Sequence, residues 1–232
     1  MHAPLAIVSS MATRQVLAEL AAAYEARTGR PVAAASMGGV DAARRVRAGE
    51  AYDVVILASD AIDQLASEGR LVAGGRVDLV RSGVAVAVRS GAPRPSIATE
   101  DDVRRAVLDA RTVSYSTGPS GVHLAKLFDR WGIAAAIASR VVQAPPGVPV
   151  GALVARGEVE LGFQQLAELM HLEGIDVLGP LPGAIQIVTT FSGAPSAASQ
   201  RQDEARALLA YLASPEADEA KRRHGMEPAR GA

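Results

Sequence analysis

The stretch YDVVILASDAIDQLASEG, residues 52–69, is a strand pattern that runs directly into a helix pattern. Its first part is a short apolar run, residues 54–57, of the length expected for a buried strand. The polar turn Ser59-Asp60 follows, and then a segment with helical character that ends at Gly69. A strand followed at once by a helix is the repeating unit of a parallel α/β sheet.

The same order recurs towards the N-terminus. Strand patterns at residues 4–10 and 30–36 are each followed by a helix pattern, at residues 12–29 and 40–50. Three strand–helix units in succession predict an α/β fold with a doubly wound, mainly parallel sheet.

From residue 76 the rhythm changes, and residues 76–91 are predicted to form two strands. Further strands are expected at 111–116, 159–163, 175–183 and 184–193, and further helices at 99–110, 121–132, 149–158, 165–174, 199–214 and 215–225. We interpret this as a second sub-sheet inserted into the first. The expected domains are lobe 1, residues 1–80 plus 193–232, and lobe 2, residues 81–192, with a hinge near 80–84 and 186–192 and a cleft between the lobes.

Composition excludes several classes of protein. The 232 residues are 49% hydrophobic and carry 24 basic against 25 acidic side chains, with no basic stripe, so no nucleic-acid partner is expected. The chain has no cysteine, which removes disulfides and thiolate chemistry. The four histidines lack metal-ligand spacing, and no nucleotide-binding motif is present, so no metal or other cofactor is expected.

Membrane and targeting signals are also weak. No apolar run reaches the roughly 18 residues of a membrane span, so no membrane insertion is expected. The start, MHAPLAIVSS, lacks a basic segment followed by a long apolar one. The chain as given is therefore expected in the cytoplasm, or in the periplasm if it is a processed form. A monomer is expected.

Candidate ligand-binding residues come from the places where strands end, because ligands of open parallel sheets bind at the carboxyl ends of strands. Small, hydroxylic and amide side chains gather there, and helix starts add free N–H groups that suit an anion. The candidates are Ser9, Ser10, Met11, Gly38, Gly39, Ser59, Gly118, Ser120, Gly121, Gln164, Gln165 and Gln186.

Each of these residues also has a structural interpretation. A Ser or Gly before a helix is commonly only a cap, and Ser120 is predicted to be the N-cap of the helix that follows it. The adjacent amides Gln164 and Gln165 are costly to bury without partners. They either hold a polar ligand or serve as a cap and a solvated side chain.

As a set, IVSSM, SMGGVDAARRVRAGEAYDVVILASDAIDQLASEGRLV, GPSGVHLAKLFDRWGI and GEVELGFQQLAEL resemble the type II periplasmic solute-binding proteins, and most closely their molybdate-binding branch. The resemblance covers nearly the whole chain. It implies two α/β lobes, a hinge, and oxyanion binding by hydroxyl groups and backbone amides. Ser10 matches the first serine of that family's site.

Three positions depart from the molybdate binders. Gly38 and Gly39 stand where that branch has a serine-containing turn, and Gln165 stands where it has a tyrosine. The loss of two hydroxyl donors and the gain of amides favour a larger polar ligand than molybdate. The segment GPLPGAIQIVTTFSGAPSAAS resembles a side branch of aconitate isomerases, which move the double bond of a tricarboxylate by shifting a proton.

Three functions stay open. The first is a solute-binding protein that closes on a small anion, a di- or tricarboxylate, with an ABC permease as partner if the chain is exported. The second is an isomerase of the aconitate type, for which His123, one turn into a helix, is the candidate base. The third is a molybdate or other oxyanion carrier. A half-exposed helix position is the structural alternative for His123.

Overall fold

The computed structural model describes residues 3–145 and 147–229 of the chain. Two compact units divide it: unit 1 is Met1–Ser82 with Thr190–Ala232, and unit 2 is Gly83–Thr189. Strands β4 and β8 carry the chain from one unit to the other and back. Each unit is a mixed sheet flanked by helices, so the predicted α/β class is confirmed. A hinge near 80–84 and 186–192 stays a prediction.

Unit 1 has strand order β2-β1-β3-β8, with the first part of β4 next and β9 paired to it. Strand β1 pairs in parallel with β2 and β3, and β8 pairs antiparallel with β3. The strands are β1 (Leu5–Ser10), β2 (Val32–Met37), β3 (Val54–Ala58), β4 (Val77–Arg89), β8 (Val188–Pro195) and β9 (Glu227–Pro228). The helices are η1 (Met11–Thr13), α1 (Arg14–Thr28), α2 (Gly39–Arg47), α3 (Ser59–Ser67), α9 (Gln202–Ala213), η4 (Pro215–Ala217) and α10 (Asp218–Arg223).

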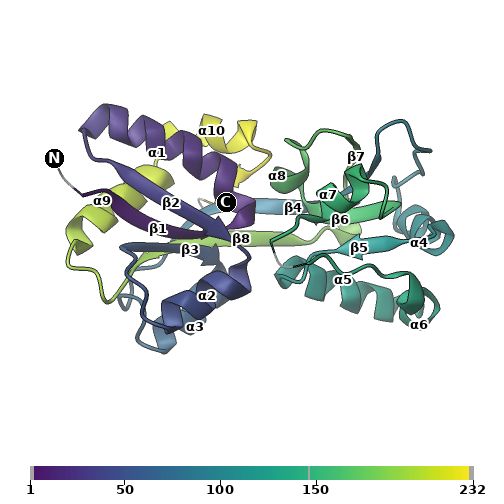
Figure 1. Ribbon diagram of the computed structural model, residues 1–232, viewed down its shortest axis with the longest axis horizontal. Coiled ribbons are helices and arrows are strands. Elements are labelled where there is room, and N and C mark those ends of the chain that lie inside the picture. The colour runs from purple at the N-terminus through teal and green to yellow at the C-terminus, as the bar shows by residue number, and fades with distance from the viewer. Residues whose placement is uncertain (1–2, 146, 230–232) are drawn as a thin grey trace. The chain divides into compact units, whose positions relative to one another are not determined.

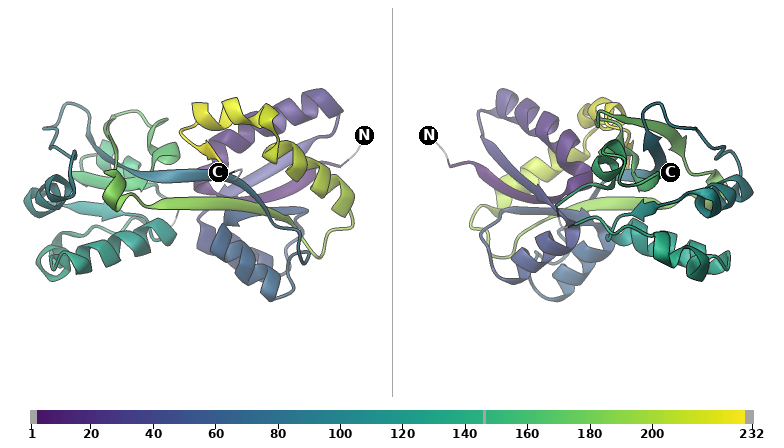
Figure 2. Two further views of the ribbon diagram at one scale, coloured as in Figure 1. Left: turned by 180° about the vertical axis from the view of Figure 1, so that it is seen from behind. Right: turned by 45° about the vertical axis from the view of Figure 1, so that its right-hand side comes forward.

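Alternation along the strands places helices on both faces of this sheet (Figure 1). Val55 and Leu57 pack with Ile62 and Leu65 under α2 and α3. Helices α1, α9 and α10 cover the other face, and Figure 2 shows α10 beside α1. Every residue of β3 is buried, as expected for a central strand covered on both faces. The strand and the helix predicted within residues 52–69 are therefore β3 and α3, and α3 covers one face of the unit 1 sheet.

Unit 2 has strand order β7-β4-β6-β5, in which β5 and β6 are parallel and β4 is antiparallel to both β6 and β7. Its strands are β5 (Val113–Tyr115), β6 (Leu161–Gln165) and β7 (Ile175–Pro180), besides β4. Its helices are α4 (Glu100–Asp109), α5 (Pro119–Arg130), α6 (Ala134–Ile137), η2 (Ala138–Arg140), α7 (Val150–Ala155), α8 (Leu166–Leu169) and η3 (Gly183–Ile185).

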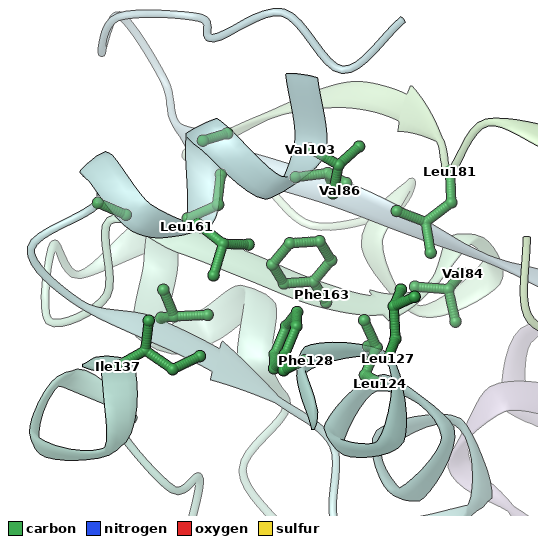
Figure 3. Close-up of a cluster of buried hydrophobic side chains, with 14 of the residues drawn as sticks. Val84, Val86, Val103, Leu124, Leu127, Phe128, Ile137, Leu161, Phe163 and Leu181 are labelled. Carbon is green, nitrogen blue, oxygen red and sulfur yellow. The ribbon is translucent and has the colours of Figure 1, made fainter. Parts of the chain in front are cut away.

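Successive side chains of β4 point to opposite faces of the unit 2 sheet, and different helices pack on each face. Val84 and Val86 belong to a core shared with α4, α5 and α6, in which the rings of Phe128 and Phe163 meet edge-to-face at 6.1 Å between centroids (Figure 3). Ala85 and Ala87 point the other way, and their small side chains let Leu169 of α8 pack against the sheet.

Three expectations about the elements were wrong. Residues 77–89 form one strand and not two, because Gly83 lies within the strand and continues it. The side-chain amide of Gln186 lies 3.1 Å from the position of a Cβ on Gly83, so this glycine allows a close approach within the strand. The helix expected at 165–174 is only the four-residue α8, and α6 with η2 was not foreseen.

Asp53 joins three segments of unit 1 just before β3. Its carboxylate accepts hydrogen bonds from the backbone amide of Ala6 at 2.9 Å and from the hydroxyl of Ser199 at 2.6 Å, and it forms an ion pair with Arg201. Arg201 also donates to the carbonyls of Ala3 and Pro4. Burial alone would raise the pKa of Asp53, but these donors outweigh it and hold the pKa below its usual value.

We expect Asp53→Ala to destabilise the protein by about 3 kcal/mol, because it removes the acceptor of the Ala6 amide and the Ser199 hydroxyl and the counter-charge of Arg201. Urea unfolding at neutral pH measures this loss. Asp203→Ala is the control, because Asp203 is a fully exposed partner of Arg206. A loss no larger than the control's would contradict the role of Asp53. Since its folded-state pKa is lowered, the contribution of Asp53 is present at neutral pH and disappears as the pH falls through that pKa.

Candidate functional site

In unit 1, three parallel strands end at one edge of the sheet, and a helical segment follows each of them directly. Strand β1 ends at Ser10, β2 ends at Met37 and β3 ends at Ala58. Their register is parallel, so the predicted residues of this unit share an edge. The structure thus brings Ser9, Ser10, Met11, Gly38, Gly39 and Ser59 to neighbouring positions at the carboxyl ends of the strands.

The two serines of β1 differ in what their hydroxyls do. Ser9 is completely buried, and its Oγ lies 2.8 Å from that of Ser36 on β2, so it joins the two strands. Ser10 is half-buried and precedes η1, and its side chain does not cap that helix. Its carbonyl accepts a hydrogen bond from Thr13 at 3.0 Å. Ser10 is therefore the better candidate for contact with a ligand.

The helices that follow β2 and β3 begin without a side-chain cap. Gly38 and Ala58 are the N-cap residues of α2 and α3, and neither supplies a hydrogen bond from its side chain. By contrast, α4 follows a loop and has a full capping box formed by Thr99 and Asp102. The first N–H groups of α2 and α3 are consequently without a side-chain acceptor, which suits an anionic ligand.

In unit 2, the turn after β5 is shaped by its glycines. Gly118 is the N-cap of α5 and Pro119 its first residue, so the prediction that Ser120 is the N-cap was wrong. Proline is favoured at the first helical position because its fixed φ suits the helix and its missing N–H is not needed there. Ser120 is buried with its Oγ 3.0 Å from that of Ser116. A Cβ on Gly121 would lie 1.5 Å from the Ser116 carbonyl oxygen, so only glycine fits.

The adjacent amides at the end of β6 are both buried and both bonded within the protein. The Gln164 carbonyl accepts a hydrogen bond from the backbone amide of Gly151 at 3.2 Å, and its Nε2 donates to Glu168 at 2.7 Å. The Nε2 of Gln165 donates to the hydroxyl of Thr189 at 3.0 Å. Gln164 therefore anchors the start of α7, which accounts for an amide at this position without a ligand.

Gln186 lies between η3 and β8 and not within a strand as expected. Its carbonyl accepts hydrogen bonds from the amides of Val84 at 3.0 Å and Ile187 at 2.8 Å, and its Nε2 donates to the Leu181 carbonyl. These contacts hold the chain beside β4 and give Gln186 a structural role. His123 is exposed in the first half of α5, next to the exposed Val122.

Sequence reasoning missed Glu168, although it belongs to the same GFQQLAEL stretch. The residue is only partly exposed, and its carboxylate takes its hydrogen bond from Gln164, four positions earlier. Burial raises the pKa of Glu168 to about 7, and the hydrogen bond from Gln164 offsets part of that rise. A lone acidic residue inside a short, otherwise apolar helix was the signal that could have drawn attention to it.

Glu168→Gln should change how stability depends on pH. The raised folded-state pKa means that the folded protein binds more protons than the unfolded chain between about pH 4.5 and 7, so wild-type stability falls as the pH rises through this window. Glutamine keeps an acceptor for Gln164 and does not titrate. We expect the variant to gain up to about 3 kcal/mol relative to wild type between pH 5 and pH 8.

Urea unfolding at the two pH values measures that gain. Glu173→Gln, at an exposed position in the turn that follows, is the matched control. A wild type and a Glu168→Gln variant with parallel pH profiles would show that the carboxyl is not protonated in the folded state near neutral pH.

Two absences concern the described part of the chain. Among residues 3–145 and 147–229, no three His, Asp or Glu side chains come together as ligands for a metal ion. Within the same residues, no helix is both long and apolar enough to cross a bilayer.

Two α/β units with small and hydroxylic residues at the carboxyl ends of their strands define a binding protein of the solute-binding class. The model of the bacterial extracellular solute-binding proteins matches residues 5–227. The chain belongs to this family, and the resemblance inferred from its motifs is confirmed.

One curated relative is similar over almost the whole chain. An aconitate isomerase of Pseudomonas sp is 41% identical over 230 residues, which are 97% of this chain and 87% of the relative.

Solved structures of anion-binding proteins share the fold. The periplasmic molybdate-binding protein of Azotobacter vinelandii superposes with a TM-score of 0.80 at 18% identity, over 96% of this chain and 98% of that one. A sulfate-binding protein of Mycobacterium tuberculosis gives a TM-score of 0.80 at 17% identity, over 99% of this chain and 88% of that one. At such low identity these similarities show the fold alone.

Proposed function

We propose that this protein binds a tricarboxylate and isomerises aconitate by shifting a proton. The observation that carries the proposal is the 41% identity to an aconitate isomerase over 97% of the chain. The match extends over both units, so it includes the strand ends of unit 1 and of unit 2.

The reaction sets two chemical requirements. A base must remove a proton from the methylene carbon of aconitate, and the resulting negative charge must be stabilised before the proton returns to the other end of the allylic system. Atoms and electrons balance within the substrate, so the reaction needs no oxidant or reductant. Hydrogen-bond donors around the substrate carboxylates would stabilise the negative charge.

The strand ends of unit 1 offer such donors. The Ser10 hydroxyl does not cap its helix, and the first N–H groups of α2 and α3 have no side-chain acceptor. Gly38 and Gly39 let a ligand approach the backbone of α2 closely, because neither has a side chain. These groups favour a carboxylate ligand with several oxygen acceptors.

Capture of a small anion without turnover is the second candidate, and the family itself favours it, since its members are described as solute-binding proteins. In that case the ligand would be a di- or tricarboxylate or an inorganic oxyanion, and an ABC permease would be the partner of an exported chain. The two candidate functions are distinguished by whether the bound ligand is converted into its isomer.

Turnover and binding are tested together on the wild-type protein. We expect the vinyl proton signals of trans-aconitate to be replaced by those of cis-aconitate in a time course followed by nuclear magnetic resonance. A thermal-shift panel of both aconitates, citrate, malonate, molybdate and sulfate accompanies it. A ligand at 100 times its dissociation constant adds about 2.7 kcal/mol to stability. Stabilisation by aconitate without conversion would favour capture, and stabilisation by molybdate alone would contradict both carboxylate proposals.

Ser10→Ala should weaken aconitate binding at least about tenfold without loss of stability, because a hydrogen bond to a charged group contributes about 1.5–3 kcal/mol. Isothermal titration calorimetry measures the affinity. Ser67→Ala is the control, since the exposed Ser67 bonds only the Gln64 carbonyl at the end of α3. Equal affinities of the two variants would remove Ser10 from the binding site.

A further inference from the structure

Glu168 differs from most other buried or half-buried carboxylates of the protein in its surroundings. Asp53 is paired with Arg201, Asp102 with Arg105 and Asp218 with Lys221. Within residues 3–145 and 147–229, no basic side chain forms an ion pair with Glu168, whose hydrogen-bond partner is the neutral amide of Gln164. A carboxyl held by a neutral donor can exchange a proton without breaking an ion pair.

The direction of the Glu168 carboxyl is fixed by a chain of two hydrogen bonds. Gln164 is 4% exposed, and the Gly151 amide holds its carbonyl, so its Nε2 is aimed at Oε2 of Glu168. The other oxygen, Oε1, has no hydrogen-bond partner among the described residues. One oxygen is thus oriented and the other remains available to a bound molecule.

The location of Glu168 also fits a site at the strand ends. Helix α8 begins directly after Gln165, the last residue of β6, and Glu168 is its third residue. Strand β6 is parallel to β5, so this end of β6 lies at the same edge as the Ser116–Gly121 turn. The residue is only partly exposed, which leaves its carboxyl both desolvated and reachable.

Apolar side chains anchor the helix that carries Glu168. Helix α8 packs against β6 and β7, and its Leu169 lies in an apolar cluster with Ala85, Ala87, Ile175 and Val177. Strand β6 has no titratable residue. Strand β7 has Asp176, which accepts a hydrogen bond from Ser90 and lies 3.7 Å from Arg94. The proton affinity of Glu168 is therefore governed by burial and not by a neighbouring charge.

We propose that Glu168 is the catalytic base that moves the proton in the isomerisation, an inference that rests on the proposed function. Oε1 takes a proton from the methylene carbon of aconitate, and the C–H electron pair becomes delocalised over the allylic carbons and the adjoining carboxylate. The same carboxylic acid then returns the proton to the former vinylic carbon. One C–H bond breaks and one forms, and Glu168 ends in its starting state. A pKa near 7 suits this exchange at neutral pH.

Glu168→Gln tests the assignment, because glutamine keeps the shape and the acceptor for Gln164 but cannot take the proton. Glu173→Gln is the matched control. We expect kcat for aconitate isomerisation to fall by about 100-fold or more in Glu168→Gln, the range for loss of a general base, and to stay unchanged in the control. The thermal shift produced by aconitate should be retained, and exchange of the substrate's methylene protons with deuterated solvent should disappear.

Three outcomes decide between the explanations. If wild type converts aconitate and Glu168→Gln retains a rate within about threefold of it, Glu168 is not the base, since a general base contributes at least about 100-fold. If wild type binds aconitate but never converts it, the proposed isomerase function fails and the assignment fails with it. If Glu168→Gln unfolds, the pH profile of the wild type provides the test. Its kcat/KM should rise through about pH 7, and absence of that inflection overturns the proposal.

Discussion

The carboxylate of Asp53 is the interaction on which unit 1 depends. The chain leaves this unit at Ser82 and returns only at Thr190, so the last part of the sequence must find the sheet built by the first part. Asp53 meets this need because it binds the amide of Ala6 at the start of β1 together with Ser199 and Arg201 of the returning segment. Pairing of β8 with β3 continues directly from this point. A buried charge is tolerated there because every donor around it is used.

Hydrogen bonds of buried amides serve the same purpose in unit 2. Gln164 fastens the start of α7 to β6, and Gln186 fastens the segment before β8 to β4. A sequence that buries such amides must provide partners for them, and one partner of Gln186, the amide of Val84, lies 102 positions away along the chain. Gln164 additionally orients the carboxyl of Glu168, the residue proposed as the base.

The fold of a binding protein accounts for capture of a ligand. It does not by itself supply the proton transfer that the proposed isomerisation requires. Hydroxyls and free helix N–H groups at strand ends can hold an anion in any member of such a family. The isomerisation proposed for this chain requires in addition a base whose proton affinity lies near neutral pH. In the proposed mechanism Glu168 of the short helix α8 is this base, and burial raises its pKa to about 7.

The sequence by itself determined the α/β class, the order of most elements and the family, because apolar periodicity, turn residues and motifs are local properties. It predicted the α1 helix and its end at Gly29, where the chain adopts a left-handed φ of 68°. Tertiary structure decided the rest. The continuous strand at Gly83 packs closely against the amide of Gln186, about a hundred residues away, and the proton affinity of Glu168 depends on burial in a helix that packs on β6 and β7. Burial and distant partners are properties of the folded chain, so a local pattern could mark Glu168 as unusual but could not give its proton affinity.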